Sequence, residues 1–312
     1  MAEITAALVK ELREITGAGM MDCKKALTAT EGDLDKAVDF LREKGLAGAQ
    51  KKAGRIAAEG VVETAICCCG QDAVIVEVNA ETDFVAKNEK FKGFVAEVAS
   101  QVLKSESKNI EEFMEEKWLL DESLSVKDKL SSMISVIGEN MSIRRFEKVK
   151  EPKGLVVDYI HAGGKIGVLV DIETDVVNEA IKEMGKNLAM QIAALRPVYT
   201  SEKEISAEYL AKEREIILAQ IKNDPKESQK PDHVINGMVN GRLNKQLKEI
   251  CLLDQVYVKA EDGKQSVAKY VEETAKANSA NLNVKGFIRF ETGEGLEKKS
   301  EDFAAEVAKQ MA

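Results

Sequence analysis

Apolar residues recur at helical spacing along the first part of the chain and predict three short helices. The glycine-rich stretch at 16–19 ends the first helix, and the second covers residues 22–30. The third begins after Asp33, a good N-cap residue, and ends at Gly45. The expected buried stripes are, in chain order, Ile4, Leu8, Leu12 and Ile15; Cys23, Ala26 and Leu27; and Leu34, Ala37, Val38 and Leu41. Because such small helices bury little surface, we expect residues 1–54, which include an Ala-, Gly- and Lys-rich linker, to be a docking module.

Residues 55–150 first alternate in the manner of strands and then return to helical spacing. The stretches "VVETAICCC" and "DAVIVEVN" predict a hairpin of two strands around Gly70. A helix over 89–104 follows the hairpin. A charged helical stretch containing Trp118, a helix near 126–138 and a strand in "SIRRFEKVK" complete this segment, which we interpret as the first core subdomain.

Residues 154–175 repeat the pattern of residues 60–83: a strand, a glycine-bearing turn, a Val-rich strand and the tripeptide Glu-Thr-Asp. A helix follows in both places. This internal similarity predicts two related α+β subdomains with antiparallel sheets. The copies differ after the tripeptide, where the first has Phe84 and the second has Val176. A phenylalanine is therefore not required merely to connect the strand to the helix.

Residues 201–255 interrupt the second copy with two helical patterns that flank "DPKESQKP". They predict an inserted antiparallel helical hairpin with a Pro-capped tip. The second subdomain then has a first part at 151–200 and a second part at 256–295. The segment "DQVYVK", a helix in "SVAKYVEETAKA" and a strand in "VKGFIRFE" complete it. Residues 296–312 predict a last amphipathic helix, so the fold class is α+β throughout.

Composition and charge limit the functions that the chain can have. Its 312 residues are 44% apolar, 32% charged and 5% aromatic, as in an ordinary soluble globular protein. The net charge of −9 argues against generic binding of nucleic acid. No apolar run reaches the ~18 residues that cross a bilayer, and the N-terminus is typical of an amphipathic helix, not of a signal peptide. We expect a cytoplasmic protein with no membrane contact and no direct nucleic-acid contact.

Five cysteines raise the question of a metal or redox site. Cys67, Cys68 and Cys69 are consecutive, and neighbouring residues of a strand point to opposite faces, so the run is a poor chelate. The sequence has no CxxC pair and two histidines. We expect reduced, partly buried thiols, no metal and no cofactor.

The sequence contains no recognisable catalytic constellation. It has no Walker A loop, and the glycines at 163–168 precede a strand, whereas a dinucleotide-binding loop follows one. Neither His161 nor His233 lies in a nucleophile elbow. The abundant carboxylates are those of solvated helix faces. We therefore predict no catalytic residues and interpret the chain as a binding protein.

Phe84 stands beside Asp83 in the connection between a strand and a helix that each have apolar residues of their own. In one interpretation the ring packs into its own domain as a helix-entry staple. In the other it projects as a wedge, meaning an apolar ring with an acid beside it that inserts into a partner. Burying a Phe ring contributes ~1.5–3 kcal/mol, enough to hold open a gap between packed elements. Phe40, one position off its helix stripe, is a second exposed candidate or a rim residue.

Three long motifs, "LVKELREITGAGMMDCKKAL", "TDFVAKN" and "GFIRFETGEG", resemble the bacterial elongation factor Ts family, and the resemblance covers nearly the whole chain. It implies a ubiquitin-associated-like N-terminal module, two α+β core subdomains, an inserted helical hairpin and a C-terminal helix. It also implies a guanine-nucleotide exchange factor that binds elongation factor Tu–GDP and accelerates GDP release, without covalent chemistry, so that GTP can bind again. The Cys-Cys-Cys run is a local departure from the family.

The resemblance assigns roles to particular residues. The residues expected to enter the GTPase domain of elongation factor Tu and disturb its magnesium and phosphate site are Thr82, Asp83, Phe84 and Val85. Lys24 and His161 are further expected contacts, and a second domain of elongation factor Tu is also expected to bind. The charged faces of the hairpin fit pairing of subunits, as a homodimer or a 2:2 complex, contact with the partner, or both.

Two other classes of function stay open. One is a non-catalytic adaptor whose three-helix module docks a segment of another protein. Deletion of residues 1–54 separates the two classes, because an adaptor would lose all binding and an exchange factor mainly affinity. The other is a thiol or metal enzyme, which requires a bound metal or a labile thiol at Cys67–Cys69.

Overall fold

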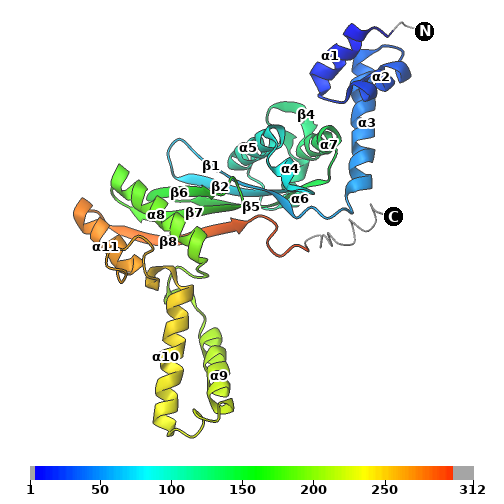
Figure 1. Cartoon of the computed structure of the whole chain (residues 1–312). Helices are drawn as coiled ribbons and strands as arrows, with labels where there is room; N and C mark the ends of the chain where they lie inside the picture. Colours follow the sequence, from blue (N-terminus) through cyan, green and yellow to red (C-terminus); the bar gives the residue numbers. More distant parts are fainter. Residues whose placement is uncertain (1–3, 298–312) are drawn as a thin grey trace.

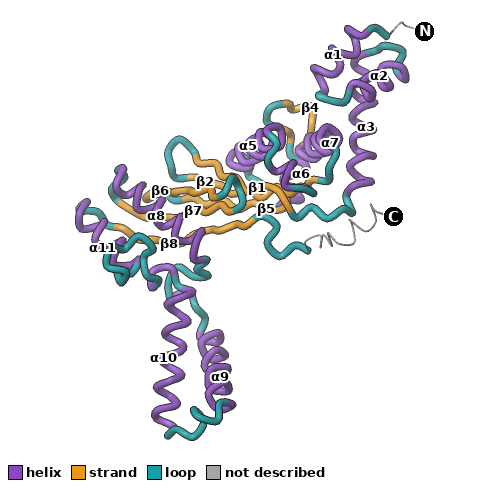
Figure 2. The backbone as a smooth tube through the Cα atoms, viewed as in Figure 1, coloured by secondary structure: helices purple, strands orange, loops and turns teal. Residues whose placement is uncertain are grey.

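Residues 4–297 are described by the computed structural model, and they form an α+β fold, as predicted. Two three-stranded antiparallel sheets occupy the centre, with the N-terminal helices at one end and a long helical hairpin at the other (Figures 1 and 2). None of the helices within 4–297 has both the length and the apolar character to span a membrane. The helix expected over 296–312 lies outside the described residues except for its first two positions.

Three helices form the N-terminal module: α1 (Ala6–Thr16), α2 (Met20–Ala29) and α3 (Leu34–Lys52). The predicted N-cap is confirmed, because the side chain of Asp33 accepts a hydrogen bond from the backbone N–H of Lys36 at 3.0 Å. One member of the predicted stripe is wrong. Ile15 is 61% exposed, whereas Val9 is buried, because the inward face of α1 is rotated toward Val9 and leaves Ile15 at the helix edge. The buried core of the module is Val9, Leu12, Cys23, Ala26, Leu27 and Ala37.

Helix α3 continues past Gly45 to Lys52, through the segment that the sequence predicts to be a linker. That prediction is wrong because the second half of α3 packs against α7 (Val126–Ile137). Gly45 is buried beside Ser135, and Lys52 Nζ donates to the carbonyl of Ile134 at 3.4 Å. Alanine and lysine favour helix, and this packing outweighs the ~1 kcal/mol that glycine costs in a helix.

The first sheet has the strand order β1-β2-β5. β1 (Glu59–Ile66) and β2 (Asp72–Ala80) form the predicted hairpin, and β5 (Met141–Lys150) pairs with the other edge of β2. Helix α5 (Glu89–Lys104) covers one face of the sheet. The smaller elements of this subdomain are α4 (Asp83–Ala86), α6 (Ile110–Glu115), β3 (Lys117–Trp118) and β4 (Asp121–Ser125).

Trp118 lies in strand β3, not in the helical stretch that the sequence predicts. Its side chain is 1% exposed and stacks on Phe94 of α5, with 6.0 Å between ring centroids. The side chain of Gln101 donates to the carbonyl of Lys117 at 2.9 Å and accepts from the N–H of Leu119 at 2.7 Å. These two bonds hold the backbone around Trp118 extended, so tertiary contacts decide the conformation.

The second sheet repeats the first, with the strand order β6-β7-β8, as the internal similarity predicts. The stretch "DQVYVK" starts at the last residue of a 3-10 turn, Leu252–Asp254, and forms a single bridge from Val256 to Ser266. The elements of this sheet and its helices are β6 (Gly154–His161), β7 (Ile166–Thr174), β8 (Leu282–Glu291), α8 (Glu179–Leu195) and α11 (Val267–Asn278).

The two sheets pack face to face, which explains why their Val-rich strands are buried on both sides. Helices α5 and α8 cover the outer faces (Figure 1). The hydroxyl of Thr64 donates to Asp158 across the interface at 2.5 Å. Each aliphatic side chain buried between the sheets contributes ~1.5–3 kcal/mol. This inner layer consists of Val62, Ala73, Ile75, Val156, Leu169 and Phe290.

Helices α9 (Ala207–Asn223) and α10 (Asp232–Ile250) form the predicted antiparallel hairpin, which extends away from the sheets (Figure 2). Its tip contains Pro225 and Pro231. One apolar stripe of each helix faces the other, and the remaining faces are solvated. The buried stripe residues are Ile217, Ile221, Ile235, Val239, Leu243 and Leu247.

The turn between β1 and β2 brings two cysteines together. Cys67 and Cys69 form a disulfide, whereas Cys68 is exposed and free. The expectation of reduced thiols is wrong for the bonded pair. The chain leaves β1 after Ile66 and reverses at Gly70, whose φ is +75°, so these two side chains lie on one side of a turn.

Candidate functional site

The connection between β2 and α5 carries the four residues expected to form the site. It folds into the one-turn helix α4 because Thr82 caps it, its hydroxyl accepting the N–H of Val85 at 3.3 Å. Glu139 braces the cap from the α7–β5 connection. Its carboxylate accepts the backbone N–H of Thr82 at 3.0 Å and the hydroxyl at 2.8 Å.

The residue before the cap is fixed in the same way. The carboxylate of Glu81 accepts the backbone N–H of Asn140 at 2.6 Å and a guanidinium N–H of Arg55 at 3.4 Å. The side-chain amide of Asn140 donates to the carbonyl of Arg55 at 2.8 Å. Glu81 and Glu139 therefore join the start of α4 to two other segments of the chain, and the turn has little freedom to rearrange.

Phe84 points out of this braced turn. Its side chain is 81% exposed, whereas Val85 and Ala86 are 8% and 6% exposed and belong to the core of the first subdomain. A single helical turn cannot bury three consecutive residues, and the two after Phe84 occupy the inward face. The staple interpretation is therefore wrong, and the ring projects. Of the four expected site residues, Val85 packs in the core and Thr82 caps α4. The side chains of Asp83 and Phe84 are the two that are accessible to a partner.

Asp83 lies beside the projecting ring as a carboxylate. Lys87, one turn later, donates to its Oδ2 at 2.6 Å, and the Asp83 side chain is 46% exposed. This hydrogen bond lowers the pKa of Asp83 below 3.8, and the charges of Lys87 and Lys165 act in the same direction. The site thus presents an ionised acid next to an exposed aromatic ring.

The turn between β6 and β7, which belongs to the second subdomain, packs against β1, the strand that α4 also contacts. The positive charge of Lys165 in this turn contributes to the lowered pKa of Asp83. Lys165 also forms an ion pair with Glu59 at the start of β1. Gly164 holds the turn against β1. Its carbonyl accepts the N–H of Val62 at 2.7 Å, its φ is +97°, and a Cβ there would lie 2.6 Å from Val61.

His161 and Lys24 lie in different places. His161 is exposed at the end of β6, beside the β6–β7 turn, and its Nδ1 lies 2.9 Å from the hydroxyl of Tyr159. Lys24 is exposed on α2, well apart from α4 in Figure 1.

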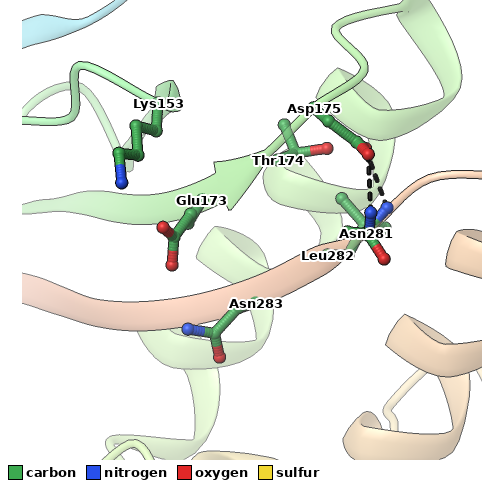
Figure 3. Close-up of a pocket in the computed structure, with 7 residues that line it drawn as sticks. All are labelled: Lys153, Glu173, Thr174, Asp175, Asn281, Leu282 and Asn283. Carbon is green, nitrogen blue, oxygen red and sulfur yellow. Dashed lines mark hydrogen bonds between the residues drawn. The ribbon is translucent and has the colours of Figure 1, made fainter.

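The second Glu-Thr-Asp tripeptide allows a comparison with the first, because no phenylalanine follows it. Asp175 accepts hydrogen bonds from Asn281, at 2.8 Å from the backbone N–H and 2.6 Å from the side chain (Figure 3). No helix corresponding to α4 follows Asp175 in the described structure, and Val176 is half-buried against the core. A shallow hollow of about 490 Å³ lies here, lined by Lys153, Glu173, Thr174, Asp175, Asn281, Leu282 and Asn283.

The region that contains both tripeptides matches a known family. A sequence model described as "Elongation factor TS" matches residues 81–294. Elongation factor Ts of Clostridium tetani is 51% identical over 308 residues, with 99% of each chain covered. That of Clostridium novyi is 50% identical over 308 residues at the same coverage, and that of Clostridium perfringens is 51% identical over 306 residues, with 98% of each covered. The chain belongs to the elongation factor Ts family. Its role is accordingly that of a translation elongation factor.

The stretch that the family's sequence model matches ends at Glu294, and a buried carboxylate on β2 fixes the chain there. Glu77 of β2 is fully buried and pairs with Arg144 at 3.0 Å and Arg145 at 2.6 Å. Its carboxylate also accepts the backbone N–H of Gly293 at 2.7 Å. The carbonyl of Glu294 accepts a hydrogen bond from Arg144 at 2.5 Å. The chain after β8 is therefore attached to the first sheet before it enters the C-terminal segment.

Sequence reasoning missed Lys165 and Glu77 as parts of this arrangement. Lys165 meets Glu59 across 106 positions of sequence, which no local pattern reveals. The buried position of Glu77 could have been predicted, because it is an acid inside a strand that is otherwise apolar. The adjacent arginines in "SIRRFEKVK" were its available partners.

Proposed function

We propose that the chain binds elongation factor Tu–GDP and accelerates the release of GDP by inserting Phe84 and Asp83 beside the magnesium and phosphate site. The observation that carries this proposal is the 81% exposure of Phe84 on a turn that Glu81 and Glu139 brace. An exposed ring on a mobile loop would lose conformational freedom on binding. A ring on a braced turn loses much less, so more of its burial energy is available to act on the partner.

Asp83 supplies the electrostatic part of the proposed action. Magnesium neutralises the charge of nucleotide phosphates and prefers carboxylate oxygens as protein ligands. A carboxylate brought next to that ion competes with the phosphates for it and repels them. Because the hydrogen bond from Lys87 lowers the pKa of Asp83, the group is in the charged form at neutral pH.

The proposed mechanism contains no covalent step, so the protein would act as an exchange factor and not as an enzyme. GDP and the exchange factor bind one partner with negative coupling, and each weakens the affinity of the other. Each ~1.4 kcal/mol removed from the release barrier accelerates release about tenfold. Rebinding of GTP would eject the exchange factor by the same coupling.

Other surfaces would supply the affinity that keeps the wedge in place. We assign Lys24 on α2 and His161 beside the β6–β7 turn to this role, since both are exposed. In this proposal, these surfaces together contact the GTPase domain and a second domain of elongation factor Tu. The reaction belongs to the cytoplasm, where translation elongation takes place.

The test follows fluorescently labelled GDP as it leaves elongation factor Tu, with and without the protein. Wild type should accelerate release strongly, and Phe84→Ala should reduce that acceleration about 10- to 100-fold, the equivalent of ~1.5–3 kcal/mol. Val177→Ala is the matched control, because Val177 is 55% exposed after the second Glu-Thr-Asp tripeptide. No acceleration by wild type would refute the proposal.

A further inference from the structure

The β1–β2 turn holds a second chemically distinctive cluster. The Sγ atoms of Cys67 and Cys69 and a carboxylate oxygen of Asp72 lie within 4.8 Å of one another. Within residues 4–297, this is the one group of three Cys, His or acidic residues whose donor atoms gather so closely. The Cα atoms of the two cysteines are 5.4 Å apart.

Backbone hydrogen bonds hold this cluster in place. Asp72 donates its N–H to the sulfur of Cys67 at 3.2 Å, and Cys67 donates its own N–H to the carbonyl of Asp72 at 2.8 Å. The N–H of Gly70 bonds the Cys67 carbonyl at 2.9 Å, and the Gly70 carbonyl accepts the N–H of Val156 from β6 at 2.8 Å. An N–H directed at a sulfur stabilises a thiolate and orients it, as outer-shell partners of metal ligands do.

We propose that this turn, once Cys67 and Cys69 are reduced, binds a thiophilic divalent cation of the Zn²⁺ type. The ligands are the two thiolates and the carboxylate of Asp72. Zn–S distances of about 2.3 Å and Zn–O distances of about 2.0–2.2 Å place the donors of a tetrahedral site about 3.4–3.8 Å apart. The donors already lie within 4.8 Å, so small side-chain rotations complete the site. Water takes the fourth position.

The bound cation and the disulfide exclude each other. A dithiol reductant gives two electrons and two protons to the Cys67–Cys69 bond, which yields two thiols and the reductant's own disulfide. Zn²⁺ then replaces the two thiol protons, which leave to solvent as the Zn–S bonds form. The turn can therefore hold a cation in a reducing environment and a disulfide in an oxidising one.

The surroundings allow a cation to enter. The turn borders a surface hollow of about 610 Å³ that is also lined by β6 and by the first turns of α8, including Glu179 and Glu183. The lysines of the same turns, Lys182 and Lys186, balance these acids. The selectivity of the site therefore comes from its two sulfur donors and not from a general negative field.

The site is separate from the proposed wedge. Cys67 follows the end of β1 that pairs Ile66 with Ala73, whereas α4 follows the other end of the hairpin, where Glu59 pairs with Ala80. About eight residues of strand, or roughly 25 Å, lie between the two ends. Cation binding and nucleotide exchange can therefore be tested independently.

The experiment uses the full chain, reduced with dithiothreitol that is then removed under anaerobic conditions. Zn²⁺ is titrated against a chromogenic chelator, and Co²⁺ is added separately to detect the thiolate-to-metal charge-transfer band. Reduced wild type should bind one Zn²⁺ per chain and show the band. Cys67→Ser and Cys69→Ser should bind at least about tenfold more weakly and show a weaker band, and Asp72→Asn should weaken binding by a similar factor.

Cys68→Ser is the matched control, because Cys68 lies in the same turn but outside the disulfide and the ligand set. Its affinity should stay within about twofold of wild type, and the oxidised protein should not bind. Circular dichroism confirms that each variant is folded. Failure of reduced, folded wild type to bind Zn²⁺, or equal binding by Cys67→Ser, would overturn the proposal.

Discussion

The carboxylate of Glu139 accepts two hydrogen bonds from Thr82, one from its backbone N–H at 3.0 Å and one from its hydroxyl at 2.8 Å. The next residues are Asp83 and Phe84, so this pair fixes the base of the projecting ring. If the ring acts because its position is preset, then loss of this brace should impair exchange while Phe84 stays in the chain.

Thr82→Ala tests the brace. It removes the cap of α4 and one bond to Glu139, which should lower the free energy of unfolding by about 0.5–2 kcal/mol. The acceleration of GDP release should also fall, as measured with labelled GDP. Thr174→Ala is the control, because Thr174 makes a similar local bond, to Val176, in the second tripeptide. Unchanged exchange by Thr82→Ala at saturating concentration would show that the brace is dispensable.

Asp83→Asn tests the charge beside the ring. It keeps the shape and removes the negative charge, and we expect the maximal release rate to fall about tenfold, or ~1.4 kcal/mol of barrier. Because the Lys87 hydrogen bond lowers the pKa of Asp83 below 3.8, the contribution of this group should be constant from pH 5 to 8. A ratio of wild-type to Asp83→Asn rates that changes steeply between pH 5 and 8 would contradict this assignment.

Glu77→Ala tests the buried charge that attaches the end of the matched region to the first sheet. It leaves Arg144 and Arg145 without their shared carboxylate, and removal of one partner from such a network costs about 3–5 kcal/mol. Urea unfolding should detect this loss. Glu147→Ala, at an exposed position of the same strand β5 that carries the arginines, should change stability by less than about 0.5 kcal/mol. Equal stability of Glu77→Ala and wild type would show that the network contributes nothing.

Asp171 should make stability depend on pH. Burial, followed by its contact with the carboxyl of Glu151, raises the pKa of Asp171 to about 6. Between its unfolded pKa of about 3.8 and its folded pKa of about 6, the folded protein binds more protons than the unfolded chain. This group's contribution to stability therefore falls as pH rises through that window, and the loss persists at neutral pH.

Asp171→Asn should accordingly raise the unfolding temperature relative to wild type at pH 7.5, and the difference should shrink toward pH 4. Glu151→Gln should have the opposite effect at neutral pH. Glu151 is buried, and although burial alone would raise its pKa, its hydrogen bonds with Lys285, the backbone N–H of Lys153 and Asp171 together make the net shift downward. Thermal unfolding at several pH values measures both. A stabilisation by Asp171→Asn that is independent of pH would rule out this titration.

The repeated elements of the fold were predictable because their cause is local. Valines at alternate positions and a glycine at each turn specify both hairpins, and the similarity of the two copies identifies the second sheet from the first. The Val-rich strands have apolar residues on both faces, and the sequence alone did not explain why. The face-to-face packing of the two sheets is the reason, because it buries the second face.

The errors lie where distant contacts outweigh local preference. A glycine in the position of Gly45 commonly marks the end of a helix, but the packing of α3 against α7 stabilises the helix as far as Lys52. The backbone on either side of Trp118 is held extended by Gln101 of helix α5. Phe84 could not be placed from pattern alone, because the pattern does not say which residues of a single helical turn face inward. Val85 and Ala86 decide that question in the folded chain.

In the proposed mechanism, Phe84 acts on the release of GDP and not simply on affinity for elongation factor Tu. The decisive measurement titrates wild type and Phe84→Ala against elongation factor Tu loaded with labelled GDP, until the release rate reaches its plateau. We predict a plateau about 10- to 100-fold lower for Phe84→Ala, with half-saturation displaced far less than the plateau. Equal plateaus reached at a higher concentration of the variant would contradict the claim, since the ring would then provide only binding energy.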